Sequence, residues 1–290
     1  MIESTPFIPH TLAHLTEAKV FPSPLPEAAY SKMLAEYAAL DVITSRITYD
    51  SQGLRVTGLS ALPATIQKQS HPILIYNRGG SHEYGKLTVI SVLRSMAPFA
   101  RAGFLVYASN YRGADGGEGS EDFGGEDVQD VLQLIEAAKQ NPAWDGKNIF
   151  MLGHSRGGMM TCLAMKHGAQ LSAAIILASL TDLWQAAEQN AAVDALYHRL
   201  IPELSADREA MLKARSPVYW PEQISAPLYL LHSQSDDVVP AQHSLQLADA
   251  LTKQKKPHNL HLYSDANHAL LRVWDDVLAR SLSWFGEHHA

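Results

Sequence analysis

Short runs of apolar residues alternate along most of the chain with longer stretches in which apolar residues recur every three or four positions. Apart from His261 in the last of them, the short runs are apolar throughout and have the length of buried strands. They span residues 73–76, 104–108, 149–152, 173–178, 228–231 and 260–263. The periodic stretches predict helices over residues 87–99, 127–139, 158–166, 244–251 and 269–285. Strands that are apolar on both faces must be covered on both, so the pattern predicts an α/β fold with a mostly parallel, twisted sheet and helices on both faces.

The first part of the chain departs from this alternation. It predicts a single helix over residues 27–40, followed by two alternating segments, 43–49 and 54–59, which form a hairpin around a glycine-containing turn. We therefore expect residues 1–70 to form an extension that packs on a main domain of residues 71–290.

A second departure lies between two predicted strands. Residues 181–221 are helical in pattern and punctuated by prolines, and they are too long for an ordinary connection. This segment is either a small helical cap inserted over a site or an elaborate surface connection without a function.

The composition narrows the classes of protein that fit this pattern. The chain has 290 residues and a formal net charge of −7, and a negatively charged surface repels phosphate backbones, so we expect no nucleic-acid partner. The single cysteine, Cys162, excludes an intramolecular disulfide and a cysteine-rich metal site. The apolar runs are far shorter than the roughly 18 to 20 residues that cross a bilayer, and the first residues do not read as a secretory signal. We expect a cytoplasmic protein with no membrane partner.

The predicted strand at 149–152 runs directly into the sequence G-H-S-R-G-G at 153–158, and a predicted helix follows. This is a G-x-S-x-G pattern in a strand–turn–helix setting. A serine at the tip of so sharp a turn needs small residues two positions to either side, because larger side chains would collide. The N–H of Arg156 then opens the helix, where it can point at an oxyanion. Ser155 is the candidate nucleophile; the alternative is a glycine-rich turn with an incidental serine.

A serine hydroxyl needs a base, and the base needs a third group to hold it. In α/β-hydrolases the acid and then the histidine follow the serine, each on a loop after a strand. Asp236 follows the predicted strand at 228–231, and His268 follows the one at 260–263. Both therefore lie at the carboxyl ends of parallel strands, where open α/β sheets place their sites.

Other residues compete for these roles. Asp237 is next to the candidate acid but would point elsewhere on an extended loop, and Asp265 would orient a histidine only if its loop doubled back. His232 precedes the acid, and we expect it to be packed or to stabilise a turn. His10 and His14 have a spacing that can hold a metal, but no acidic third ligand lies near them in the sequence. For that pair we expect a solvated face and no metal.

Several blocks occur in a characteristic order. They are N-Y-R-G at 110–113, F-G-G-E-D at 123–127, G-H-S-R-G-G at 153–158, R-S-P at 215–217, I-S-A-P at 224–227 and H-S-Q-S-D-D-V-V-P at 232–240. With these blocks the chain from about residue 73 onward resembles the catalytic domain of the prolyl oligopeptidase family, which consists of serine peptidases with an α/β-hydrolase fold. The resemblance selects Asp236 over Asp237, and His268 matches the closing histidine. About seventy residues precede this region, so we expect no β-propeller of the kind that many members carry.

The chain also departs from the family pattern. Ser233 stands where the acid loop of the family usually has glycine, and Arg78-Gly79-Gly80 stands where many members have H-G-G-P. By analogy with the family, the N–H of Arg156 and a second donor from Arg78, Gly79 or Gly80 form the oxyanion hole. Arg78 either places its guanidinium at the oxyanion or pairs with a carboxylate and supports its loop.

We therefore expect a serine hydrolase, without cofactor or metal, that cleaves amide (peptide) bonds through Ser155, His268 and Asp236 and an acyl-enzyme. Its substrate is a small molecule or short peptide. A carboxylesterase or other acyl-ester hydrolase is the alternative. A non-catalytic α/β-hydrolase-fold binding protein is the second alternative. The pattern leaves a homo-oligomer open.

Overall fold

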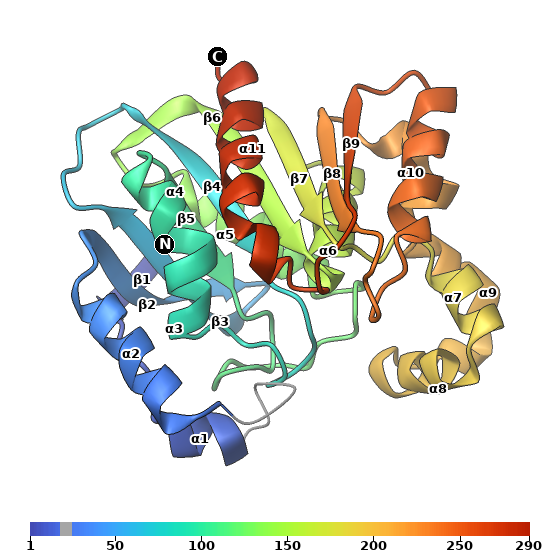
Figure 1. Ribbon diagram of the computed structural model, residues 1–290, viewed down its shortest axis with the longest axis horizontal. Helices are drawn as coiled ribbons and strands as arrows, with labels where there is room; N and C mark the ends of the chain where they lie inside the picture. The colour runs from blue at the N-terminus through green and yellow to red at the C-terminus, as the bar shows by residue number, and fades with distance from the viewer. Residues whose placement is uncertain (18–24) are drawn as a thin grey trace. The chain divides into compact units, whose positions relative to one another are not determined.

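The computed structural model describes residues 1–17 and 25–290 (Figure 1). The contacts within this part of the chain divide it into two compact units. They are unit 1, Met1–Glu121 with Gln129–Ile149, and unit 2, Asp122–Val128 with Phe150–Ala290. Among the described residues, no helix combines the length and the apolar character that crossing a membrane requires.

Unit 1 holds a sheet in which the strands lie in the order β1-β2-β3-β5-β4. These strands are β1 (Ile2–Pro6), β2 (Val42–Ser51), β3 (Leu54–Pro63), β4 (His71–Asn77) and β5 (Leu105–Ser109). The helical segments are α1 (Leu12–Glu17), α2 (Glu27–Ala38), α3 (Val89–Ser91), the π-helical turn η1 (Val92–Met96), α4 (Ala97–Arg101) and all but the first residue of α5 (Val128–Ala138). β4 and β5 are parallel, whereas β1, β2, β3 and β5 pair antiparallel in succession.

The predicted hairpin is confirmed as β2 and β3. Gln52 and Gly53 in its turn have φ angles of 55° and 81°, as a tight turn between right-twisted strands requires. β1 was not predicted from the sequence. Its residues are mostly polar and exposed, and it pairs antiparallel with β2 at the edge of the sheet.

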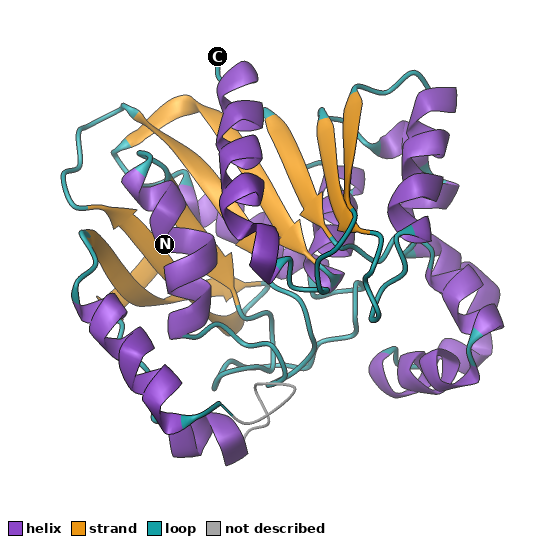
Figure 2. Cartoon of the chain, in the orientation of Figure 1, coloured by secondary structure: helices purple, strands orange, loops and turns teal. Residues whose placement is uncertain are grey.

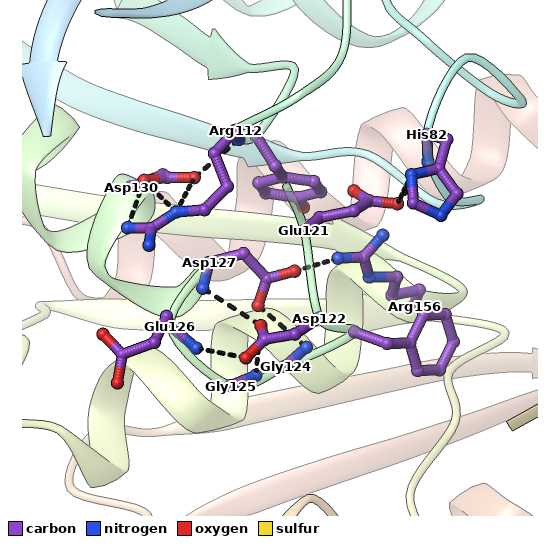
Figure 3. A network of polar contacts seen from close by, with 12 residues as sticks. His82, Arg112, Glu121, Asp122, Gly124, Gly125, Glu126, Asp127, Asp130 and Arg156 are labelled. Carbon is purple, nitrogen blue, oxygen red and sulfur yellow. Dashed lines mark hydrogen bonds and ion pairs between the residues drawn. The ribbon is translucent and has the colours of Figure 1, made fainter. Parts of the chain in front are cut away.

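A buried carboxylate organises the segment N-Y-R-G in unit 1. Asp130 accepts hydrogen bonds from the backbone N–H of Arg112 at 2.7 Å and from the Arg112 guanidinium at 2.9 Å (Figure 3). It also accepts from the hydroxyl of Ser51 at 2.6 Å. Because the carboxylate is fully buried and fully bonded, it joins the end of β5 to α5 and to the β2–β3 turn.

Unit 2 holds a sheet in which β6, β7, β8 and β9 pair parallel in that order. The strands are β6 (Trp144–His154), which begins in unit 1, β7 (Ala173–Leu177), β8 (Leu228–Ser233) and β9 (His258–Tyr263). The helical segments are α6 (Arg156–Lys166), α7 (Leu183–Gln189), α8 (Ala191–Leu200), η2 (Leu204–Ala206), α9 (Arg208–Ala214), η3 (Pro217–Tyr219), η4 (Pro221–Gln223), α10 (Gln242–Lys253), η5 (Leu271–Val273) and α11 (Trp274–Glu287). Both α11 and α6 contact β7, α11 from the front in Figure 1 and α6 from behind. The predicted α/β class is confirmed.

Two predicted helices differ in detail. The helix predicted at 269–285 begins only at Trp274, because Asn267 closes a turn with the N–H groups of Leu270 and Leu271 at 2.8 and 3.0 Å. Leu270 has a φ of 54° there, which no α-helix allows. The stretch predicted at 87–99 contains the π-helical turn η1 in place of a continuous α-helix.

The segment 181–221 consists of short helices joined by tight loops (Figure 2). Its first residues are tied to α10, because the N–H groups of Thr181 and Asp182 both donate to Nδ1 of His243 at 3.1 Å. Its two ends are tied to each other by the N–H of Leu183, which donates to the hydroxyl of Ser216 at 2.8 Å. Since Nδ1 of His243 accepts two hydrogen bonds, it carries no proton.

This arrangement predicts a specific dependence of stability on pH. Burial, followed by the nearby His232, lowers the pKa of His243 to about 4, from an ordinary value near 6.5. The unfolded chain therefore binds a proton that the folded chain refuses between these values. The contribution of His243 to the free energy of unfolding is fully present above pH 6.5, and about 3 kcal/mol of it is lost as the pH drops to 4. Urea unfolding of wild type and His243→Asn across this range measures the difference.

The asparagine variant should show a flatter profile than wild type between pH 6.5 and 4. His167→Asn, at an exposed position, serves as the control and should retain the wild-type slope. Equal slopes in wild type and His243→Asn would contradict this account of how His243 binds the first residues of the segment 181–221.

Candidate active site

Ser155 lies at the junction of β6 and α6, in a backbone conformation that is rare for a residue with a side chain. Its φ is 56° and its ψ is −123°. Its N–H donates to the carbonyl of Leu177 at 2.8 Å, and its carbonyl accepts from the N–H of Gly158 at 3.0 Å and the hydroxyl of Ser179 at 3.1 Å. The surrounding strand and helix thus hold the strained residue in place, as a nucleophile elbow requires.

Gly153, two residues before Ser155, is sterically required, as predicted, and so is Gly158, three residues after it. A Cβ on Gly153 would lie 2.2 Å from the carbonyl oxygen of Gly157, and one on Gly158 would lie 2.1 Å from the hydroxyl of Ser179. Gly153 thus faces neighbouring backbone and Gly158 faces the side chain of Ser179, and at neither position does a side chain fit.

Arg156, the first residue of α6, turns its side chain into the interior of unit 2. The guanidinium pairs with the buried carboxylate of Asp127 and lies over the ring of Phe123 at 4.7 Å (Figure 3). Asp127 is held in turn by the N–H of Gly124 at 2.8 Å. The side chain thus anchors the start of α6, and the backbone N–H of Arg156 lies in the first turn, where N–H groups have no partner within the helix.

Asp236 is buried on the loop after β8, and its carboxylate accepts hydrogen bonds on both oxygens. Oδ1 accepts from the N–H groups of Val238 and Val239, each at 2.9 Å. Oδ2 lies 2.8 Å from Nδ1 of His268 and 3.3 Å from Nε2 of His232. Burial alone would raise the pKa of Asp236, but the hydrogen bonds from His232, His268 and Val239 hold it well below its usual value. Asp236 is therefore a carboxylate and acts as an acceptor.

Nδ1 of His268 consequently carries the proton of this hydrogen bond, and Nε2 is the ring nitrogen left to act as a base. A side chain that sequence reasoning missed also holds this residue. His154 donates from Nε2 to the backbone carbonyl of His268 at 3.0 Å, and the two rings lie 4.9 Å apart. The sequence feature that could have indicated His154 is its position next to Ser155 in the G-x-S-x-G pattern. Within the part of the chain that the structure describes, the hydroxyl of Ser155 makes no hydrogen bond.

The competing residues occupy other positions. Asp237 is exposed, and Asp265 is exposed and pairs with Arg272 at 3.2 Å. His232 is fully buried, as expected for a packed histidine. Its Nε2 donates to the carbonyl of Val239 at 2.8 Å, and its Nδ1 accepts from the hydroxyl of Ser244 at 2.7 Å.

Arg78, Gly79 and Gly80 belong to unit 1, where the guanidinium of Arg78 is buried. Its Nε, Nη1 and Nη2 atoms donate at 2.6 to 3.2 Å to the backbone carbonyls of Gly79, His82, Tyr84 and Asn110. The guanidinium also lies 3.7 Å from the carboxylate of Glu121, which accepts from the N–H of His82 (Figure 3). The five hydrogen bonds to backbone carbonyls match the five N–H groups of a guanidinium. This favours the second interpretation of Arg78, in which it supports its loop.

His10 and His14 stack on each other in unit 1, with ring centroids 5.0 Å apart. The expectation of a solvated face is wrong for His10, whose Nε2 lies 3.5 Å from a carboxylate oxygen of the buried Asp115. The ammonium of Lys86 lies 3.2 Å from both His14 Nε2 and Asp115. The loop that carries Asp115 lies against His10, just before the start of α1, and the sequence alone does not predict a contact between residues so far apart.

A parallel sheet, a nucleophile elbow and an Asp–His pair on later strand ends together define an α/β-hydrolase fold. The solved structure titled Pyrococcus horikoshii acylaminoacyl peptidase (uncomplexed) has this fold. It matches with a TM-score of 0.73 and 21% identity over 88% of this chain and 43% of that one. The profile of the peptidase S9, prolyl oligopeptidase family matches residues 91–290, and the chain belongs to this family of serine peptidases.

Two curated relatives illustrate the range of lengths in the family. The Bacillus subtilis protein named uncharacterized peptidase YtmA is 33% identical over 223 residues, which are 77% of this chain and 84% of that protein. The acylamino-acid-releasing enzyme of Rattus norvegicus is 28% identical over 241 residues, which are 76% of this chain but only 32% of that enzyme. The chain thus spans most of the first relative and about a third of the second.

The crowding at the elbow predicts the effect of a single methyl group. Gly153→Ala places a Cβ against the backbone of Gly157, which cannot move aside as a flexible side chain can. We expect the free energy of unfolding to fall by at least about 3 kcal/mol, measured by urea denaturation. Gly286→Ala is the matched control: its site in α11 is open, and the substitution should leave stability unchanged or slightly higher. Similar stabilities of the two variants would refute the steric argument.

Proposed function

We propose that the protein hydrolyses amide bonds of small substrates as a prolyl oligopeptidase-like serine peptidase. The observation that carries this proposal is the hydrogen bond of 2.8 Å between His268 Nδ1 and the buried carboxylate of Asp236. It lies in the same compact unit as the strained elbow at Ser155. Membership of a serine peptidase family supports the reaction class.

In the proposed mechanism, Nε2 of His268 takes the hydroxyl proton of Ser155 as the oxygen attacks the carbonyl carbon of the substrate. Asp236 remains ionised, fixes the imidazole tautomer and stabilises the imidazolium that forms. The backbone N–H of Arg156 stabilises the tetrahedral oxyanion, because it opens α6 and its position is anchored by the buried side chain.

The imidazolium of His268 then donates its proton to the departing amine as the carbon–nitrogen bond breaks and the Ser155 ester forms. Water, deprotonated by the same Nε2, attacks the acyl carbon of this acyl-enzyme. The imidazolium then returns its proton to the Ser155 oxygen as the bond to the acyl group breaks, which releases the acid and restores the free hydroxyl. Amide hydrolysis depends on this delivery because an unprotonated amine is a poor leaving group, whereas an activated ester leaves without it.

The nucleophile assignment predicts a sharp loss of activity without loss of structure. Ser155→Ala should reduce turnover by at least about 10³-fold and abolish labelling by a fluorophosphonate probe, because no other hydroxyl occupies the elbow. Ser235→Ala, which removes an exposed hydroxyl from the acid loop, should label and turn over like wild type. Labelling is read by mass spectrometry and folding by thermal melting. A folded Ser155→Ala enzyme with wild-type turnover would overturn the assignment, and an unreactive wild type would favour a binding protein.

The choice between a peptidase and an esterase is tested with matched substrates. An aminoacyl amide and an aminoacyl ester with the same acyl group and a comparable leaving group size should both be hydrolysed by wild type and not by Ser155→Ala. Relatives named as acylamino-acid-releasing enzymes support amide cleavage. Measured kcat/KM values decide: turnover of the ester alone would replace the peptidase with a carboxylesterase.

A further inference from the structure

The hydroxyl of Ser233 is fully buried at the end of β8 and takes no part in the mechanism above. It donates to the carbonyl of Ala266 at 2.7 Å and accepts from the N–H of Ala266 and the N–H of Ser235, each at 3.1 Å. A hydroxyl has one donor and two acceptor lone pairs, so its entire hydrogen-bonding capacity is used. Two of the three bonds reach a single residue on the loop after β9.

Ala266 is itself buried and lies two residues before His268. After His268, the N–H groups of Leu270 and Leu271 bond back to Asn267 and close a turn, and His154 holds the carbonyl of His268. The segment that carries the imidazole is therefore anchored on both sides, and Ser233 supplies the anchor on the side that comes first in the chain.

We propose that Ser233 is a positioning residue that sets the orientation of the His268 imidazole by holding the backbone of Ala266. This inference rests on the proposed function, because it assigns Ser233 a role in the reaction of Ser155. Loss of the hydroxyl leaves a buried N–H and a buried carbonyl of Ala266 without partners, a state that buried backbone avoids by shifting. A shift there is passed along two peptide units to His268, and proton transfer is sensitive to small misplacements.

The orientation of His268 is also set by its bond to Asp236, which joins the same two loops. The bonds from Ser233 and the bond from His268 to Asp236 thus span one gap in parallel. If Ser233 is lost, the remaining bonds between the loops, from Ser235 to Ser264 and from Gln234 to Tyr263, lie farther from the imidazole, and near the ring the Asp236–His268 bond must keep the loops in register. We therefore expect that bond to lengthen or to fluctuate, and the ring to remain folded in but less well aligned.

The test compares Ser233→Ala with Ser235→Ala. Ser235 is the matched control because its exposed hydroxyl also bridges the two loops, to the carbonyl of Ser264 at 2.9 Å, but farther from the imidazole. For Ser233→Ala we expect kcat and the rate of fluorophosphonate inactivation to fall about tenfold in parallel, with KM within about twofold of wild type. Ser235→Ala should stay within about twofold of wild type in all three.

A spectroscopic readout separates positioning from general destabilisation. The proton between His268 Nδ1 and Asp236 should give a far-downfield proton resonance in wild type that is absent from His268→Ala. Ser233→Ala should move this resonance upfield or broaden it at a temperature where thermal melting shows the variant fully folded. Ser233→Thr keeps the hydroxyl and should restore both the resonance and most of kcat. Ser233→Gly, which removes the same hydroxyl, gives the comparison should the alanine variant be unstable.

The outcomes are distinguishable from failure of the proposed function. If wild type reacts with the probe, Ser155→Ala does not, and Ser233→Ala matches wild type in kcat and in the resonance, then only the role of Ser233 is overturned. That role is also overturned if the threonine variant is as slow as the alanine variant. If wild type fails to react, both proposals fall together.

Discussion

The structure of unit 2 depends on keeping a carboxylate ionised where water does not reach it. An anion buried without partners would be neutralised by a proton, and Asp236 escapes this because four N–H groups converge on it. Those donors come from its own loop, from β8 and from the loop after β9. His232, one of the four, is bonded in turn to Ser244 in α10. Satisfying one charge therefore requires strand, helix and two loops to reach their places together.

The elements that could be predicted are those whose burial leaves a mark on the sequence. Buried strands such as 173–178 read as unbroken apolar runs, and the order serine, acid, histidine at their ends is visible without coordinates. The turn around Ser155 could also be predicted from the sequence, because only glycine fits where Gly153 faces Gly157. In these places a local rule and the overall fold require the same residues.

What could not be predicted rests on partners distant in the sequence or on exposed polar residues. β1 is an edge strand with little apolar content, so its pairing with β2 has no periodic signal. The turn at Asn267 depends on its side chain, which accepts from the N–H of Leu271 four residues later, and it delays a helix whose apolar pattern has already begun. The contact of His10 with Asp115 joins residues more than a hundred positions apart.

The side chain and the backbone N–H of Arg156 have separate roles. Its guanidinium belongs to the interior, committed to Asp127 and Phe123, and its amide faces the beginning of α6. The identity of residue 156 therefore matters for the buried ion pair with Asp127, whereas the backbone N–H does not depend on which side chain the residue carries. A replacement at 156 would keep the backbone N–H but lose the buried contacts with Asp127 and Phe123, so it would weaken the start of the helix first.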